Sequence, residues 1–342
     1  MTTPNRGGWA MQLVCPAGNL PALKAAVDNG ADAVYVGFKD QTNARAFPGL
    51  NFDEASLKTG IAYAHERGRK VYLALNTYPD SARIAEWEAA VDRAAALGAD
   101  AIIAAELAVL DYALRHHPGL PRHLSVQGSA TTQAALRYYA ERFGIARAVL
   151  PRVLSLQQVE RLCEHAPVPI EVFAFGSLCI MVEGRCQLSS YVTGASPNRH
   201  GVCSPAKFVR WEELPEGQRA VRLNGVLIDR FEAGEPAGYP TVCKGRFEVN
   251  DEIFHALEEP TSLNTLALLP RLAAAGVAAV KIEGRQRGLA YVSTVARTWR
   301  AALDRHAADP ASYAADPGWQ GALAAHAEGS QTTLGPYHRE WH

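Results

Sequence analysis

The chain has 342 residues, 48% of them hydrophobic and 20% charged, and its formal net charge at pH 7 is −1. This composition is ordinary for a soluble globular enzyme, and the lack of a basic excess argues against a nucleic-acid partner. No apolar run approaches the roughly 20 residues that cross a bilayer, and no apolar signal peptide opens the chain, so we expect a cytoplasmic protein without a membrane span. Residues 1–10 are predicted to be a disordered lead, with Met11 as a candidate start.

A repeated junction organises the sequence. Gly30, Gly98 and Gly276 each stand four residues before a β-branched residue that opens or continues a short apolar run. Glycine readily takes the left-handed conformation that ends a helix. A run that stays apolar at consecutive positions is typical of a strand buried on both faces, as in a parallel sheet. The junctions therefore predict repeated units in which a helix is followed by a strand of a parallel sheet.

Strands and helices alternate along most of the chain. Small polar residues at Asn19, Asp53, Ser81 and Ser155 precede helical stripes and are predicted to cap them. Eight such strands favour an α/β fold of the (β/α)8 TIM-like barrel type over an open doubly wound sheet, because no G-x-G-x-x-G loop follows the first strand. The strands are expected near residues 11–15, 33–37, 71–76, 101–105, 123–127, 147–151, 170–175 and 279–283.

A long segment after the seventh strand breaks this rhythm. Residues 177–262 show no regular alternation, and they hold four of the six cysteines. We expect a long irregular insertion that leaves the carboxyl end of a barrel strand, which is where barrel enzymes place their sites. Helical spacing resumes after Ser262, and a last helix is expected over about 289–305. The tail is predicted to pack across the barrel or to be partly disordered.

The cysteines of the insertion are Cys179, Cys186, Cys203 and Cys243, spaced C-x6-C-x16-C-x39-C. Four thiolates suit zinc or an iron–sulfur cluster. Structural zinc sites usually pair their ligands as C-x2–4-C, which is absent, so the wide spacing modestly favours a [4Fe–4S] cluster. The residues that flank these four cysteines are polar and typical of turns, which argues against cysteines that merely pack in the apolar core. Zinc, disulfides and four unrelated thiols stay open as alternatives at this point.

The other two cysteines, Cys15 and Cys163, lie in apolar segments and are not expected to bind metal. Cys163 continues the apolar face of a helix and is interpreted as core, and Cys15 ends the first strand and is interpreted as a buried strand residue. The predicted divisions of the chain are the disordered lead 1–10, the first seven barrel strands 11–176, the iron–sulfur insertion 177–262, the last barrel units 263–305 and the C-terminal tail 306–342.

Basic residues gather in the insertion and around the eighth strand. Arg185, Lys207, Lys281 and Arg285 are our candidate contacts for an anionic small molecule, since arginine forks onto carboxylates. The alternative is a solvated, salt-bridged rim. No G-x-S-x-G or H-E-x-x-H motif of a familiar hydrolase is present, and the catalytic residues stay unassigned.

Residues 173–186 resemble the signature of the collagenase-like peptidase family. Further stretches similar to its ubiquinone-biosynthesis branch extend the resemblance over essentially the whole chain from Met11. These stretches are residues 15–24, 198–211, 239–245, 255–266, 281–286 and 329–339.

The resemblance implies a [4Fe–4S] cluster on Cys179, Cys186, Cys203 and Cys243. It also implies a heterodimer with a second family member, UbiV-like, that carries its own cluster. The implied activity is hydroxylation of the ring of a ubiquinone precursor without dioxygen, during anaerobic growth. Relatives hydroxylate tRNA or rRNA bases and use prephenate as oxygen donor, a dicarboxylate that would suit the basic residues. The alternatives are an RNA-base hydroxylase and a cluster-bearing scaffold that activates its partner. A peptidase is less favoured, because no nucleophile–base pair stands out.

Overall fold

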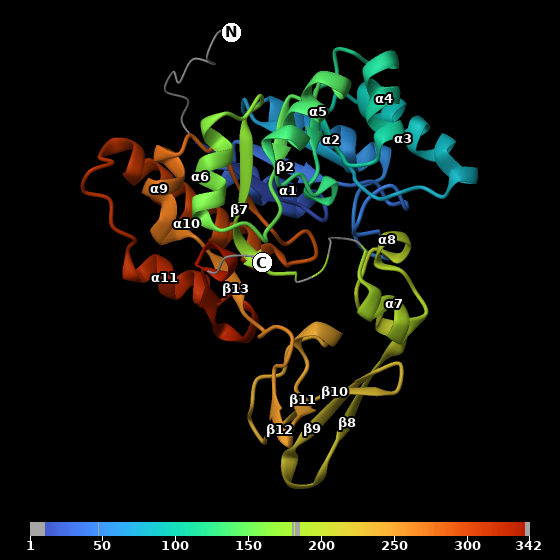
Figure 1. Ribbon diagram of the computed structural model, residues 1–342, viewed down its shortest axis with the longest axis vertical. Helices are drawn as coiled ribbons and strands as arrows, with labels where there is room; N and C mark the ends of the chain where they lie inside the picture. Colours follow the sequence, from blue (N-terminus) through green and yellow to red (C-terminus); the bar gives the residue numbers. More distant parts are fainter. Residues whose placement is uncertain (1–10, 47, 180, 182–184, 339–342) are drawn as a thin grey trace.

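The computed structural model describes residues 11–46, 48–179, 181 and 185–338, so the predicted lead 1–10 lies outside the described residues. Eight parallel strands form a closed barrel, in the order β14-β1-β2-β3-β4-β5-β6-β7, with β14 also paired to β7 (Figure 1). This confirms the TIM-like barrel. The barrel strands are β1 Gln12–Pro16, β2 Ala33–Val36, β3 Lys70–Leu75, β4 Ala101–Ala104, β5 Arg122–Leu124, β6 Arg147–Val149, β7 Ile170–Ser177 and β14 Ala279–Ile282.

Helices connect the strands, and most begin where the sequence predicts. Asn19 and Asp53 accept hydrogen bonds from the backbone of the first helical turn, both at 2.9 Å, and Ser155 forms a capping box. The predicted cap at Ser81 is wrong, because Asp80 caps a 3-10 turn there. The helices around the barrel are α1 Leu20–Asp28, α2 Glu54–His65, α3 Ile84–Ala96, α4 Leu107–His116, α5 Gln133–Phe143, α6 Leu156–Glu164, α9 Leu269–Ala274 and α10 Leu289–Ala308.

The junction glycines behave as expected. Gly30, Gly98 and Gly276 have φ values of +95°, +78° and +83°, the left-handed conformation that lets each helix stop and its strand begin. Between the helices and the outer face of the barrel lies the main apolar core, which includes the fully buried Trp299 and Leu57.

The inside of the barrel holds buried charges as well as apolar side chains. Glu171 on β7 accepts a hydrogen bond from Lys281 Nζ at 2.7 Å and pairs with Arg147 at 3.0 Å. Glu171 and Lys281 are 1% and 4% exposed. Lys281 therefore lies within β14, inside the range predicted for the eighth strand, and points into the barrel, where Glu171 holds it.

The insertion is more regular than expected. It forms helices and two small antiparallel sheets, which make a lobe that projects from the barrel (Figure 1). Val221, Leu223, Ile228 and Phe231 form a small core of its own. The prediction of an irregular segment was wrong, because two-residue turns join β9 to β10 and β11 to β12, and residues 214–218 join β8 to β9. The elements are α7 Gln187–Thr193, α8 Pro197–His200, β8 Val209–Glu213, β9 Arg219–Leu223, β10 Val226–Phe231, β11 Phe247–Val249 and β12 Glu252–Phe254.

The described part of the tail packs onto the barrel. Strand β15, Thr332–Thr333, pairs with β13, Ser262–Asn264, which pairs antiparallel with the carboxyl end of β7. Helix α11, Pro317–Ala324, lies against α10 (Figure 1). No helix in the described chain combines the length and the apolar character needed to cross a membrane.

Candidate functional site

The four cysteines of the insertion lie on four different local structures. Cys179 follows the end of β7, and Cys186 caps α7, with its Sγ accepting a hydrogen bond from Ser189 N at 3.4 Å. Cys203 follows α8, and its carbonyl accepts a hydrogen bond from the Ser189 hydroxyl. Cys243 lies in a 3-10 turn that packs against α7. The fold therefore draws together positions that are far apart in the sequence.

Electrostatics link these four thiols into one group. Burial raises the pKa of Cys186, and the Cys179 sulfur raises it further. Burial also raises the pKa of Cys203, where Cys186 adds to the effect, and raises that of Cys243 to about 11, where Cys179 and Cys203 contribute. Each thiol thus lies within electrostatic range of at least one other. Thiols become ligands only as thiolates, so metal binding here would release protons.

The four cysteines of the insertion are of the residue type that binds metals or iron–sulfur clusters through thiolates. None of the six cysteines, all within the described residues, forms a disulfide. No set of three His, Cys, Asp or Glu side chains among the described residues is close enough to hold a single metal ion as it stands. The four thiols are therefore grouped without forming a compact site for one ion, and their coordination of a cluster remains a proposal.

Cys15 and Cys163 are separate from this group. Cys15 is 1% exposed in β1, and burial raises its pKa strongly. Cys163 packs against the main core, and burial raises its pKa to about 12. Both observations confirm the interpretation of these two cysteines as packing residues.

The cysteine group adjoins the carboxyl-terminal mouth of the barrel. Arg45 lowers the pKa of the Cys203 thiol and Glu283 raises it, so both charges lie near this sulfur. Gly201 brings the loop close: a Cβ at this position would lie 2.3 Å from the backbone nitrogen of Ala46, and its φ is +73°. Only glycine permits this approach, which sets the Cys203 loop on the loop that carries Arg45.

The mouth itself is rich in arginine. Arg45 Nη2 lies 3.4 Å from Glu283 Oε1. Burial opposes ionisation of Glu283, but Arg45 and Arg152 outweigh it and lower the pKa of this carboxyl. Arg285 is 5% exposed, and its guanidinium donates to the side-chain oxygens of Asn43 at 2.9 Å and Asn51 at 3.3 Å. Among the charges that act on Tyr35, the three guanidinium groups of Arg45, Arg152 and Arg285 outnumber the one carboxylate of Glu283, so the field around this side chain is positive.

Tyr35 lies among these charges. Its hydroxyl donates to the carbonyl of Ile282 at 2.9 Å. Burial raises the pKa of Tyr35, and Glu283 adds to that, so the phenol stays protonated. Burial lowers the pKa of Arg285 to about 10, which still leaves it charged at neutral pH. The mouth therefore combines fixed positive charge with a neutral hydroxyl.

The four predicted anion contacts do not form one cluster. Arg285 lies in the mouth, and Arg185 donates to the carbonyl of Gln127 at 2.9 Å while its guanidinium stacks on Tyr78. Lys207 is exposed beside Phe208 on the insertion. Lys281 is held by Glu171 inside the barrel. Sequence reasoning did not single out Arg45, since it meets Glu283 only when the barrel closes across 238 positions of sequence.

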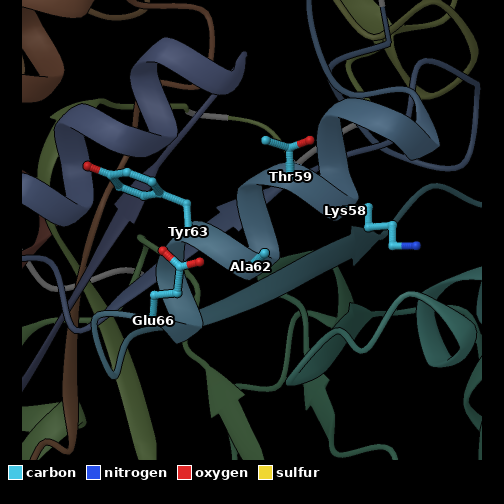
Figure 2. Close-up of a pocket in the computed structure, with 5 residues that line it drawn as sticks. All are labelled: Lys58, Thr59, Ala62, Tyr63 and Glu66. Atoms are coloured by element: carbon cyan, nitrogen blue, oxygen red, sulfur yellow. The ribbon is translucent and has the colours of Figure 1, made fainter.

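A hollow on the outer face of α2 lies apart from this site. Figure 2 shows its lining, which comes from α2 and its C-cap residue and consists of Lys58, Thr59, Ala62, Tyr63 and Glu66. Tyr63 donates to Asp28 at 2.6 Å there. This hollow lies on one exposed helix face and contains neither the arginines nor the cysteines of the barrel mouth, so it is not the candidate site.

Comparisons with known proteins find one family and several relatives. The model of peptidase family U32 matches residues 18–339. A protein of Escherichia coli named tRNA hydroxylation protein P is 31% identical over 87% of the chain, and the Escherichia coli 23S rRNA 5-hydroxycytidine C2501 synthase is 28% identical over 86% of the chain and 39% of its own length. A protein of Porphyromonas gingivalis named collagenase is 31% identical over 86% of the chain. The chain spans 64% to 68% of the length of the tRNA hydroxylation proteins that it matches. A solved U32 peptidase structure aligns over 53% of the chain at 14% identity, with a TM-score of 0.43.

Proposed function

The chain belongs to peptidase family U32, and from that membership we propose that it is the iron–sulfur component of an oxygen-independent hydroxylase. The observation that carries the proposal is the grouping of four thiols beside a positively charged barrel mouth. Relatives named for hydroxylation of tRNA and rRNA support the reaction class.

In this proposal Cys179, Cys186, Cys203 and Cys243 hold a [4Fe–4S] cluster. When bound, a cluster whose four irons are each ligated by one of these cysteines would supply electron transfer. Burial of the thiols in the insertion limits solvent access and would help to set the reduction potential of the cluster.

The residues of the mouth bind and orient the oxygen donor in this proposal. Arg45, Arg152 and Arg285 favour an anion, and a fork of two N–H groups matches a carboxylate. Prephenate, a dicarboxylate, fits this charge. Asn43 and Asn51 hold the Arg285 guanidinium in place, and the neutral Tyr35 hydroxyl lies beside it. These groups would set the donor at the barrel end that adjoins Cys203.

The names of the relatives favour an RNA base as the hydroxylated substrate, more than the ubiquinone ring that the sequence resemblance first suggested. The ring of a ubiquinone precursor stays a second candidate, because the net charge of −1 offers little attraction for a phosphate backbone. In that case the chain would act as a UbiU-like subunit in a heterodimer with a UbiV-like family member. The relative named collagenase supplies the peptidase alternative.

The test is an anaerobic assay of the purified chain, alone and with a UbiV-like protein. Placing a hydroxyl group on a C–H position removes two electrons from the substrate, so prephenate and an electron acceptor are supplied, with either unmodified tRNA and rRNA or a ubiquinone precursor as substrate. We expect mass spectrometry to find one added oxygen atom on one substrate class, with prephenate consumed. If neither substrate gains oxygen while a denatured-collagen substrate is cleaved, the hydroxylase proposal fails. If the partner alone hydroxylates at the full rate, the chain is a scaffold or is dispensable.

A further inference from the structure

Glu328 in the C-terminal tail contacts two segments that lead to different cysteines of the insertion. Its Oε1 accepts a hydrogen bond from the hydroxyl of Ser177, the last residue of β7, and its Oε2 accepts one from Lys244 Nζ. Ser177 lies two positions before Cys179. Lys244 directly follows Cys243. One carboxylate therefore joins the approach to Cys179 to the turn that carries Cys243.

The backbone of the tail is anchored beside this carboxylate by separate contacts. Glu328 N donates to the Ser262 hydroxyl at 2.9 Å, and Ser262 is paired in register with Ser177 across β13 and β7. Gly329 has a φ of +57°, and a Cβ at this position would lie 2.5 Å from the carbonyl oxygen of Pro260. The backbone of Glu328 is therefore held in place independently of the contacts that its carboxylate makes.

The Lys244 ammonium lies near two of the four sulfurs. Burial raises the pKa of the Cys203 and Cys243 thiols, and the positive charge of Lys244 opposes that effect at both. The side chains of Lys244 and Glu328 are 11% and 27% exposed, so little water screens this ion pair. Removal of either charge should therefore act on the cysteine group.

The Lys244–Glu328 pair is better suited to positioning than to stabilising the fold. Taking two charges out of water costs about as much as their attraction returns, so a buried pair adds little net stability. It does select one geometry, because each oxygen of the Glu328 carboxylate has its own partner. The two contacts span 84 and 151 positions of sequence, so they connect segments that no local contact near the cysteines connects.

We infer that Glu328 is a positioning residue of the cysteine group, which makes the C-terminal tail a part of that site. Its carboxylate holds the end of β7 and the turn of Cys243 together, and it balances the charge of Lys244 beside the sulfurs. The inference rests on the proposed function in that a cluster occupies these cysteines. The bridge consists of side chains of this chain alone, so one of its tests needs no cluster.

The first experiment is hydrogen–deuterium exchange of the full chain purified without metal, read by mass spectrometry. In Glu328→Ala we expect the amides of Lys244 and Glu258 to exchange about tenfold faster, the factor for losing one charge-assisted hydrogen bond. Both amides donate within or onto the turn of Cys243, at 3.0 Å. The control Glu248→Ala removes an exposed carboxylate from β11 and should leave these rates unchanged. Wild-type rates in Glu328→Ala, or equal acceleration throughout the barrel strands, would overturn the inference.

The second experiment measures the reduction potential of the cluster-loaded chain by a titration followed with electron paramagnetic resonance. Glu328→Gln leaves the Lys244 cation unbalanced, which favours the reduced cluster, so the potential should rise. Lys244→Met leaves the carboxylate unbalanced, so the potential should fall. A merely structural contact does not predict opposite signs, and shifts of one sign or no shift would overturn the placement of this pair at the site. If the purified chain holds no iron, the proposed function fails, and the exchange experiment still decides whether Glu328 holds the turn.

Discussion

The buried charges inside the barrel allow a graded test of what Lys281 does. Glu171 lies between Lys281 at 2.7 Å and Arg147 at 3.0 Å. In Glu171→Gln both cations lose their carboxylate, and in Lys281→Met the carboxylate keeps Arg147. Removing one partner of a buried pair costs about 3–5 kcal/mol. We expect Glu171→Gln to lose that amount, and Lys281→Met to lose about half of it because Arg147 remains.

The pH dependence follows from the Glu171 carboxyl. Burial opposes its ionisation, but Lys281 and Arg147 outweigh burial and lower its pKa from 4.5 to about 2. A lowered folded-state pKa means that this stabilisation is fully present above pH 4.5 and is lost as the pH falls toward 2. A shift of this size corresponds to about 3 kcal/mol, which agrees with the cost of removing the carboxylate.

The assay is urea unfolding followed by circular dichroism, between pH 7 and pH 3. The wild-type free energy of unfolding should fall more steeply below pH 4.5 than that of Glu171→Gln, since other carboxyl groups contribute equally to both. Losses under about 1 kcal/mol in both variants, with parallel pH profiles, would refute the buried-pair account. Lys281 would then be available to a ligand, as the sequence first suggested.

Three further predictions concern the site. Cys186→Ala should lose most of the bound iron, and Cys163→Ala should retain it, as measured by iron analysis of anaerobically purified protein. Retention of iron in Cys186→Ala would remove that residue from the ligand set. Arg285→Lys keeps a charge but loses the guanidinium fork, so prephenate binding by calorimetry should weaken about tenfold, while an unchanged Kd would place the anion elsewhere. Gly201→Ala forces a Cβ against the Ala46 backbone, 2.3 Å from its nitrogen. We expect a loss of about 1–3 kcal/mol and weaker iron retention, and normal values of both would show that the Cys203 loop does not depend on this approach.

The barrel could be predicted because its signals are local. Each junction glycine ends a helix and starts a strand within a few residues, and Gly30, Gly98 and Gly276 all take the left-handed conformation. Eight buried apolar strands then permit few arrangements, and a closed barrel is one of them. The cap at Ser81 failed because Asp80, one residue earlier, competes for the same backbone donors.

The lobe carried a signal that was overlooked. Asn224-Gly225 is a strong two-residue hairpin turn, and both residues have positive φ, at +46° and +84°. This turn joins β9 to β10. The strands on either side of this turn are short and interrupted by arginine, so their apolar pattern is weak.

The barrel mouth could be predicted only in part. Arg285 follows the last barrel strand, so its place near the mouth is a consequence of the fold. Arg45 lies in a loop after the second strand, and nothing in the local sequence indicates that it meets Glu283. Lys281 was predicted to contact an anion, but it does not face the mouth. Side chains alternate along a strand, and its position on β14 turns it inward to Glu171.

The central claim is that the four cysteines of the insertion hold one iron–sulfur cluster. The most direct test is anaerobic purification followed by iron, sulfide and zinc analysis with an absorbance spectrum. The account predicts about four irons and four sulfides per chain, with the broad visible absorbance of a [4Fe–4S] cluster. Stoichiometric zinc, no sulfide and no visible absorbance would contradict it.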